Sequence, residues 1–205
     1  FLDSLVRDPR EIVYTPHNGG HWLVTSHEMA REILSDAELF GSFPIGIPAN
    51  MEQRPRLIPL ESDANEHRRY RRLLLPIFEP TAVARLQTGA ESLAAEVLDE
   101  VLPSGEFDFL WKVAKPISMG LFVRQLGLEP ERLDEFYAWE TGFYRAPTME
   151  ERIACGERIG GYLFEVVTQH VDNPKDDIVD MLLNVDVEGE KLSLEEVHAI
   201  CYLLF

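Results

Sequence analysis

A histidine and an arginine four residues apart, His67 and Arg71, are the residues whose types and spacing could do chemistry in this chain. On an α-helix, positions four residues apart project from the same face. Both side chains donate hydrogen bonds, and arginine can bind a carboxylate through two parallel N–H groups. A pair in this arrangement could therefore hold a carboxylate or another anionic group.

The charge of the rest of the chain supports an anion at this position. Aspartate and glutamate number 36 against 19 lysines and arginines among 205 residues, a formal net charge of −17. Four of those 19 basic residues nevertheless fall within residues 68–72. Like charges this close repel one another on a helix, so an anionic ligand or an acidic partner would compensate them. A solvated basic face without a partner is the other interpretation of the same pattern.

The composition limits the class of protein. With 45% hydrophobic and 27% charged residues, the chain can bury a substantial core. No apolar run approaches the roughly 20 residues that span a bilayer, and the first residues have no signal-peptide pattern, so we expect a cytoplasmic protein without a membrane partner. The acidic balance argues against nucleic-acid binding. Cys155 and Cys201 stand without a second ligand nearby, which predicts buried apolar residues and no metal site.

The elements that must position His67 and Arg71 are predicted to be mostly α-helical, with a small β portion. Residues 21–25 have the pattern of a short strand, and Ser26 is placed to cap a helix over 27–34. Residues 40–65 contain so many proline and glycine breakers that a long irregular loop is expected, and such loops are often functional. The remaining apolar periodicity predicts helices over the basic segment and over 82–102 after Pro80, 117–126, 131–145, 150–171 and 194–205.

Three local patterns refine this prediction. Residues 185–192 could form a small hairpin around Glu188–Gly189, and Ser193 with Glu196 forms a capping-box pattern that opens the last helix. That helix has no stop signal, so we expect the chain to end inside an element. Four side chains of the basic segment are expected in the core, namely Tyr70, Leu73, Leu74 and Ile77. The aromatic group Phe136, Tyr137, Trp139, Phe143 and Tyr144 is also expected there, although part of it could cover a pocket.

Taken in order, several segments resemble the N-terminal half of a bacterial cytochrome P450, a haem-thiolate monooxygenase, over about residues 19–205. Within that family the likeness is to the soluble camphor-hydroxylase group. The resemblance implies the P450 fold, with residues 1–205 as the N-terminal part of a single domain that ends within the central I helix. The resemblance rests on the segments 20–25 (GHWLVT), 66–73 (EHRRYRRL), 78–80 (FEP), 114–117 (AKPI) with 126–128 (LGL), 176–182 (DDIVDML) and 194–198 (LEEVH).

The resemblance implies a cofactor, haem b, and residues that bind it. In the family the His-x-x-x-Arg pair of the C helix donates to the haem propionates, and His67 and Arg71 match it. Pro59 and Leu60 are implied to lie near the haem. The same helix faces an acidic ferredoxin- or flavodoxin-type electron donor, so the resemblance assigns Arg68, Arg69 and Arg72 to docking of that donor.

The resemblance also implies a reaction, hydroxylation of a small apolar terpenoid or aromatic substrate with O2 and electrons from the redox partner. Residues 43–60 correspond to the segment that covers the substrate, and Pro55 stands where the camphor hydroxylase has a tyrosine. The family's segments that carry the haem-binding cysteine loop, the Glu-x-x-Arg pair and the acid-Thr motif have no counterpart in this sequence, so the chain alone should not catalyse the reaction, and it holds no catalytic residue. The implied substrate-pocket residues are Ile45, Ile47, Leu57, Phe143 and Leu203.

A second hypothesis belongs to a different class of protein. A noncatalytic helical binding protein could dock an acidic partner through the basic segment Arg68–Arg72. The sequence of the whole protein discriminates between the two hypotheses, because only the monooxygenase requires a haem-binding cysteine loop.

Overall fold

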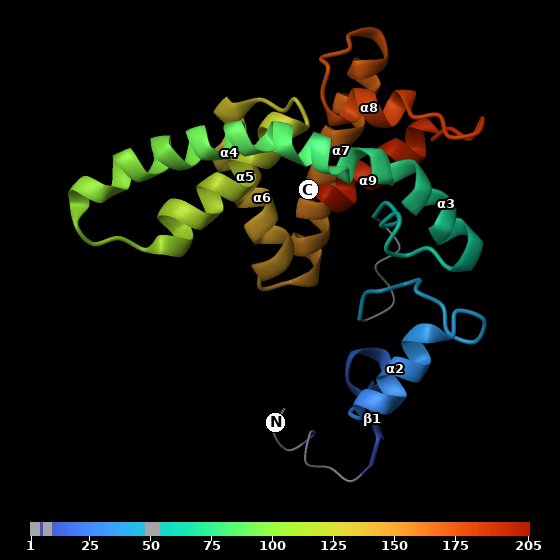
Figure 1. The fold of residues 1–205 in the computed structure, drawn as a ribbon. Coiled ribbons are helices and arrows are strands. Elements are labelled where there is room, and N and C mark those ends of the chain that lie inside the picture. Colours follow the sequence, from blue (N-terminus) through green and yellow to red (C-terminus); the bar gives the residue numbers. More distant parts are fainter. Residues whose placement is uncertain (1–4, 6–9, 48–53) are drawn as a thin grey trace.

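A computed structural model describes residue 5, residues 10–47 and residues 54–205, without the side chain of residue 85. Most of the regular structure is helical, and the sheet has two strands (Figure 1). The prediction of a mostly α fold with a small β portion is confirmed. Within the described ranges, no helix combines the length and the apolar character that a membrane span requires.

The N-terminal part forms a hairpin followed by a short helix. Strand β1 (Ile12–Thr15) pairs antiparallel with β2 (His21–Val24), and the facing rings of Tyr14 and Trp22 meet edge to face at 5.1 Å. Helix α2 (His27–Ser35) begins where Ser26 Oγ accepts a hydrogen bond from the Met29 N–H, as predicted. The sequence analysis predicted β2 but not its partner β1. In Figure 1 this part lies below the helices.

The basic segment is helix α3 (Ala64–Leu74), which follows a segment without helix or strand in its described parts. Tyr70, Leu73, Leu74 and Ile77 are all buried, which confirms the predicted inner face of the helix. A 3-10 turn (Leu75–Phe78) then leads into α4 (Pro80–Val101). Proline suits the first turn of α4 because the N–H that it lacks would have no partner inside the helix.

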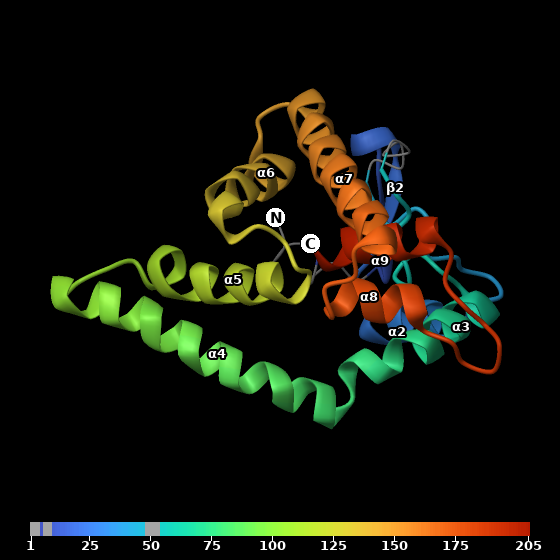
Figure 2. The ribbon, with the colours of Figure 1, turned by 90° about the horizontal axis from the view of Figure 1, so that it is seen from above.

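Helices α4 and α5 (Lys115–Gln125) form a long pair that extends away from the other helices in Figure 2, and a π-helical turn (Leu110–Ala114) opens α5. Helices α6 (Leu133–Arg145) and α7 (Met149–Asp172) form the next pair. They approach closely at Gly142, where an added Cβ would lie 2.4 Å from Cys155 Sγ. The helices predicted over 82–102, 117–126, 131–145 and 150–171 are therefore confirmed as α4 to α7, with ends that differ by a few residues.

The core lies where α7 packs against α6 and α9 (Leu194–Leu204), with α8 (Ile178–Asn184) beside α9. Phe136 and Trp139 are buried as predicted, whereas Tyr144 is 67% exposed, so its assignment to the core is wrong. Tyr144 lies in the last turn of α6, where its ring borders a cleft instead of the core. Cys201 is buried as expected, but Cys155 is only partly buried, because it lies at the α6–α7 contact near one end of both helices.

The turn before α9 confirms both local patterns. Val187 and Glu190 form a single bridge around Glu188 and Gly189, whose positive φ angles of 57° and 84° suit a two-residue turn. Ser193 Oγ then accepts from the Glu196 N–H, and the Glu196 carboxylate accepts from the Ser193 N–H at 2.7 Å.

Replacement of the cap residue, Ser193→Ala, is expected to destabilise the protein by about 1 kcal/mol, because the Glu196 N–H loses its acceptor. Urea unfolding of the full-length protein measures the change. The matched control is Thr168→Ala on the exposed face of α7, where the hydroxyl only donates back to Phe164 O and caps no helix. Equal losses in the two variants would contradict the prediction.

Candidate functional site

A cavity of about 350 Å³ lies between α3, α5, α9 and the loop that precedes α3. It brings together all four residues assigned to the cofactor from the sequence, His67, Arg71, Pro59 and Leu60. One of the five substrate-pocket residues, Leu203, also lines it. The other lining residues, which the sequence prediction missed, are Ile58, Leu74, Ile77, Phe78, Phe122, Gln125, Leu126, Ile178, Ile200 and Leu204.

Helix α3 places His67 and Arg71 beside its buried residue Leu74, which lines the same cavity. Both side chains are exposed and both border the cavity. Among the described residues, neither side chain has a hydrogen-bond or ion-pair partner. The cavity therefore has apolar walls and, at one edge, a cation and an imidazole whose donor groups are uncommitted.

The other three arginines of α3 are each bonded within the chain. Arg68 donates to Asn65 Oδ1 of the same helix, and Arg72 donates to the Glu190 carboxylate. Arg69 donates to Glu196 Oε1 at 2.7 Å and to Lys191 O at 2.7 Å. Acidic residues of the chain itself therefore compensate part of the basic cluster, which the sequence did not predict. The role of these arginines in docking a donor remains a prediction.

Glu196 joins two walls of the cavity, since it lies in the first turn of α9 and binds α3. Its carboxylate accepts from Arg69 and from the Tyr70 hydroxyl at 2.8 Å. Burial would raise the pKa of Glu196, but the donors Arg69, Ser193 N–H and Tyr70 together lower it. Burial and Glu196 raise the pKa of Tyr70 to about 12, so the Tyr70 hydroxyl stays neutral and donates. This network fixes α3, and with it His67 and Arg71, against α9.

The remaining predicted substrate residues do not line this cavity. Leu57 and Phe143 are partly buried and pack against the hydrophobic core. Ile45 and Ile47 are 49% and 58% exposed. Leu203 could be found from the sequence because it lies in the predicted last helix, and its neighbours Ile200 and Leu204 follow from the same helical period. Phe122 and Ile178 could not, because only the packing of α5 and α8 against α9 places them there.

Neither cysteine is placed to bind a group in the cavity. Cys201 is fully buried, and burial raises the pKa of its thiol to about 12, so it stays protonated. Cys155 lies at the contact with Gly142 of α6.

One cluster of possible metal ligands lies between α7 and α8, where donor atoms of His170, Asp177 and Asp180 are within 4.8 Å of one another. His170 already bonds Val166 O at 2.7 Å and Asp177 Oδ2 at 2.8 Å. Asp180 Oδ2 accepts from the Lys175 N–H at 2.5 Å. These bonds close the connection from α7 to α8, and we assign the cluster a structural role.

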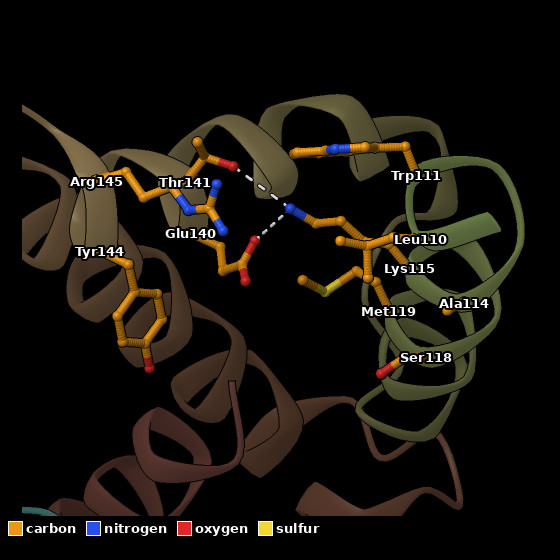
Figure 3. A pocket seen from close by; sticks show the side chains of 10 residues that line it. All are labelled: Leu110, Trp111, Ala114, Lys115, Ser118, Met119, Glu140, Thr141, Tyr144 and Arg145. Carbon is orange, nitrogen blue, oxygen red and sulfur yellow. Dashed lines mark hydrogen bonds and ion pairs between the residues drawn. The ribbon is translucent and has the colours of Figure 1, made fainter. Parts of the chain in front are cut away.

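A second cleft, of about 450 Å³, lies between the π-helical turn with α5 and helix α6 (Figure 3). Lys115 reaches across it, with Nζ 2.6 Å from Glu140 Oε2 and 4.5 Å from the centre of the Trp111 ring. Glu140 thus neutralises this lysine, and none of the residues predicted for a site lines the cleft. The cavity beside α3 is therefore the better candidate for an anionic ligand.

Comparison with known proteins gives a consistent result. No family model matches the chain. The "Steroid C26-monooxygenase" of Mycolicibacterium smegmatis is 27% identical over 189 residues, which are 86% of this chain and 44% of that protein. "Cytochrome P450 107B1" of Saccharopolyspora erythraea is 26% identical over 209 residues, 96% of this chain and 52% of the relative. The chain thus spans about half the length of the curated relatives it matches.

Solved structures give the same class of fold. The structure of CYP101J2 matches with a TM-score of 0.79 at 26% identity, over 99% of this chain and 51% of the other. A mutant of P450 EryK in complex with erythromycin B matches with a TM-score of 0.81 at 25% identity, over 99% of this chain and 54% of the EryK chain. The chain is homologous to bacterial cytochrome P450s, and its fold is that of about half of a P450 chain. The finer likeness to the camphor-hydroxylase group stays a prediction.

Proposed function

We propose that residues 1–205 are the N-terminal part of a single P450 domain that ends within its central helix, α9, and that the whole protein is a haem-dependent monooxygenase. The observation that supports this most is the position of Arg71, which borders an apolar cavity and has no partner among the described residues. Haem b is a flat apolar ring with two carboxylates at one edge. Such a ring suits a cavity whose walls are apolar and whose one side carries the donors His67 and Arg71.

In this proposal each part of the cavity has a defined task. Arg71 and His67 donate hydrogen bonds to the propionates and orient the ring. Pro59, Leu60 and Leu203 form apolar walls that keep water away from it. Haem with a thiolate ligand, which this chain does not supply, provides the chemistry of O2 activation and oxygen insertion into a C–H bond.

The cavity walls and the relatives support a proposal for the substrate class. An apolar cavity with few polar groups suits a small apolar molecule, such as a terpenoid or an aromatic compound. Relatives named as steroid C26-monooxygenases act on an apolar molecule of another kind, which agrees with hydroxylation of an apolar substrate. We also propose a cytoplasmic protein that receives electrons from a ferredoxin- or flavodoxin-type donor.

The experiment that tests the proposal is a reduced, carbon-monoxide difference spectrum of the full-length protein. The expected result is the red-shifted Soret band of a thiolate-ligated haem. If purified full-length protein, supplied with haem during expression, binds none, the proposal is wrong. The noncatalytic binding protein that docks an acidic partner through Arg68–Arg72 then becomes the better hypothesis.

Docking of the donor gives a separate prediction. Arg68 is exposed, and among the described residues its one partner is Asn65 of its own helix, so Arg68→Glu should place a repulsive charge on the docking face without breaking an ion pair in that part of the chain. We expect haem reduction by an acidic ferredoxin to slow about tenfold at low ionic strength and to recover at high salt. Stopped-flow reduction measures this rate. The control Lys112→Glu makes the same charge change at the π-helical turn, and an equal slowing there would contradict the prediction.

A further inference from the structure

We propose that Glu61 is a positioning residue for the substrate side of the site. Together with Arg54 it holds the described parts of the loop between α2 and α3, around residues 45 and 57, in one conformation, and this conformation determines which apolar molecules the site accepts. The inference rests on the proposed function, because it concerns a ligand that lies beside the cofactor.

The Glu61 carboxylate is fully buried and has four donors. Oε1 accepts from Arg54 Nη2 at 2.6 Å and from the Ile45 N–H at 2.9 Å. Oε2 accepts from Arg54 Nη1 at 2.8 Å and from the Leu57 N–H at 2.8 Å. Each oxygen thus takes one guanidinium N–H and one backbone N–H. The carboxylate ties together two parts of the loop, around residues 45 and 57, that are twelve positions apart in the sequence.

A second arginine connects the same residue to the helix of the site. Arg56 Nε donates to the backbone carbonyl of Glu61 at 2.7 Å. The Arg56 guanidinium also donates to the Glu66 carboxylate in the first turn of α3, at 2.7 and 2.9 Å. The loop is therefore fixed relative to α3, the helix that presents His67 and Arg71.

One part of the loop that Glu61 holds borders the cavity. Ile58, Pro59 and Leu60, which line the cavity, lie between Leu57 and Glu61. The backbone of Ile45 and Leu57, both assigned to the substrate pocket from the sequence, is bonded directly to the carboxylate. Release of Glu61 would free this wall while leaving His67 and Arg71 on their helix.

The ionisation and burial of Glu61 and Arg54 indicate that this pair fixes the conformation of the loop and adds little net stability. Burial would raise the pKa of Glu61, but hydrogen bonds from Arg54, Ile45 and Leu57 and the Arg54 charge lower it to about 2, so Glu61 is ionised at neutral pH. A buried ion pair contributes little net stability compared with apolar residues of similar volume, because both charges lose their hydration. What apolar residues could not supply is an acceptor for the Ile45 and Leu57 N–H groups at fixed positions.

The test uses full-length holoenzyme and two probes that differ by one methyl group, 4-phenylimidazole and 4-(4-methylphenyl)imidazole. Spectral titration gives a Kd for each probe. One methyl group in an apolar pocket changes affinity by about tenfold or more, so wild type should discriminate between the probes to that extent. In Glu61→Gln we expect haem occupancy to stay within about twofold of wild type, while the discrimination falls below about threefold.

A second variant tests the inference in case Glu61→Gln does not fold. In the double variant Arg54→Met/Glu61→Leu, apolar side chains of similar volume replace the ion pair, and we expect a folded, haem-loaded protein with the same loss of discrimination. The control is Glu190→Gln, which removes the acid of the exposed pair with Arg72 and should discriminate as wild type does.

The outcomes separate the inference from the proposed function. Wild-type protein without haem overturns the proposed function, and hydrogen exchange of residues 40–62 then tests the inference alone, since the loop should exchange faster in both variants. With haem present, unchanged discrimination in the double variant overturns the inference. Loss of haem from both variants also overturns it, because the pair would then support the whole fold. Lost discrimination with retained haem supports it.

Discussion

Full-length protein with Arg71→Ala is expected to bind haem about ten- to a hundredfold more weakly than wild type. A hydrogen bond to a charged group contributes about 1.5–3 kcal/mol, which corresponds to this range. Arg71 has no partner among the described residues, so its removal leaves no protein group unpaired and isolates the interaction with the ligand. Transfer of haem from the variant to an apo-globin acceptor measures the change. The effect of His67→Ala should be smaller, because an imidazole has fewer N–H donors than a guanidinium.

The matched control for this prediction is Arg68→Ala. Arg68 belongs to the same helix and carries the same charge, but it bonds Asn65 and does not line the cavity. We expect its haem affinity to equal that of wild type. If the variants Arg71→Ala and Arg68→Ala lose haem at the same rate, the cavity beside α3 does not hold the propionates, and the assignment of both cofactor residues is wrong.

Phe136→Ala is expected to lower the free energy of unfolding by about 3–5 kcal/mol, the cost of removing a fully buried phenyl ring and leaving a cavity. Phe136 has no exposed surface, and its ring lies 5.2 Å from that of Tyr162 and 5.6 Å from that of Trp139. It also meets Phe205 edge to face at 5.9 Å. The ring therefore joins α6, α7 and the end of α9. Urea unfolding of the full-length protein, followed by circular dichroism, measures the loss.

The control for the core prediction is Tyr144→Ala on the same helix. Tyr144 is 67% exposed, so its removal should change the free energy of unfolding by less than about 1 kcal/mol. A small effect of Phe136→Ala, comparable to that of Tyr144→Ala, would show that this contact between three helices is not part of the stable core.

The internal pairing of the basic cluster bears on the choice between the two hypotheses. A binding protein that docks through Arg68–Arg72 needs those arginines to be available, but Arg69 and Arg72 are bonded to Glu196 and Glu190. Arg71, in contrast, is exposed beside an apolar cavity. The geometry thus favours a ligand with apolar surface and carboxylates over an acidic protein surface.

Local chemistry in the sequence determined most of the helices. Ser26 and Ser193 cap helices where predicted, and Pro80 opens α4. His67 and Arg71 share one face of α3 because the helical repeat places residues four apart together. These features depend on interactions within a few residues, which makes them readable from a single sequence.

Only the tertiary structure decided which charges find partners. Arg69 and Glu196 are 127 positions apart, and no local pattern relates them. The same holds for the contact of Phe122 with Phe205. Long-range pairing depends on how the helices pack, and packing results from the summed burial of many apolar side chains. The sequence therefore indicated His67 and Arg71 as a candidate pair for an anion, whereas only the fold shows that Arg71 lies at the cavity without a partner among the described residues.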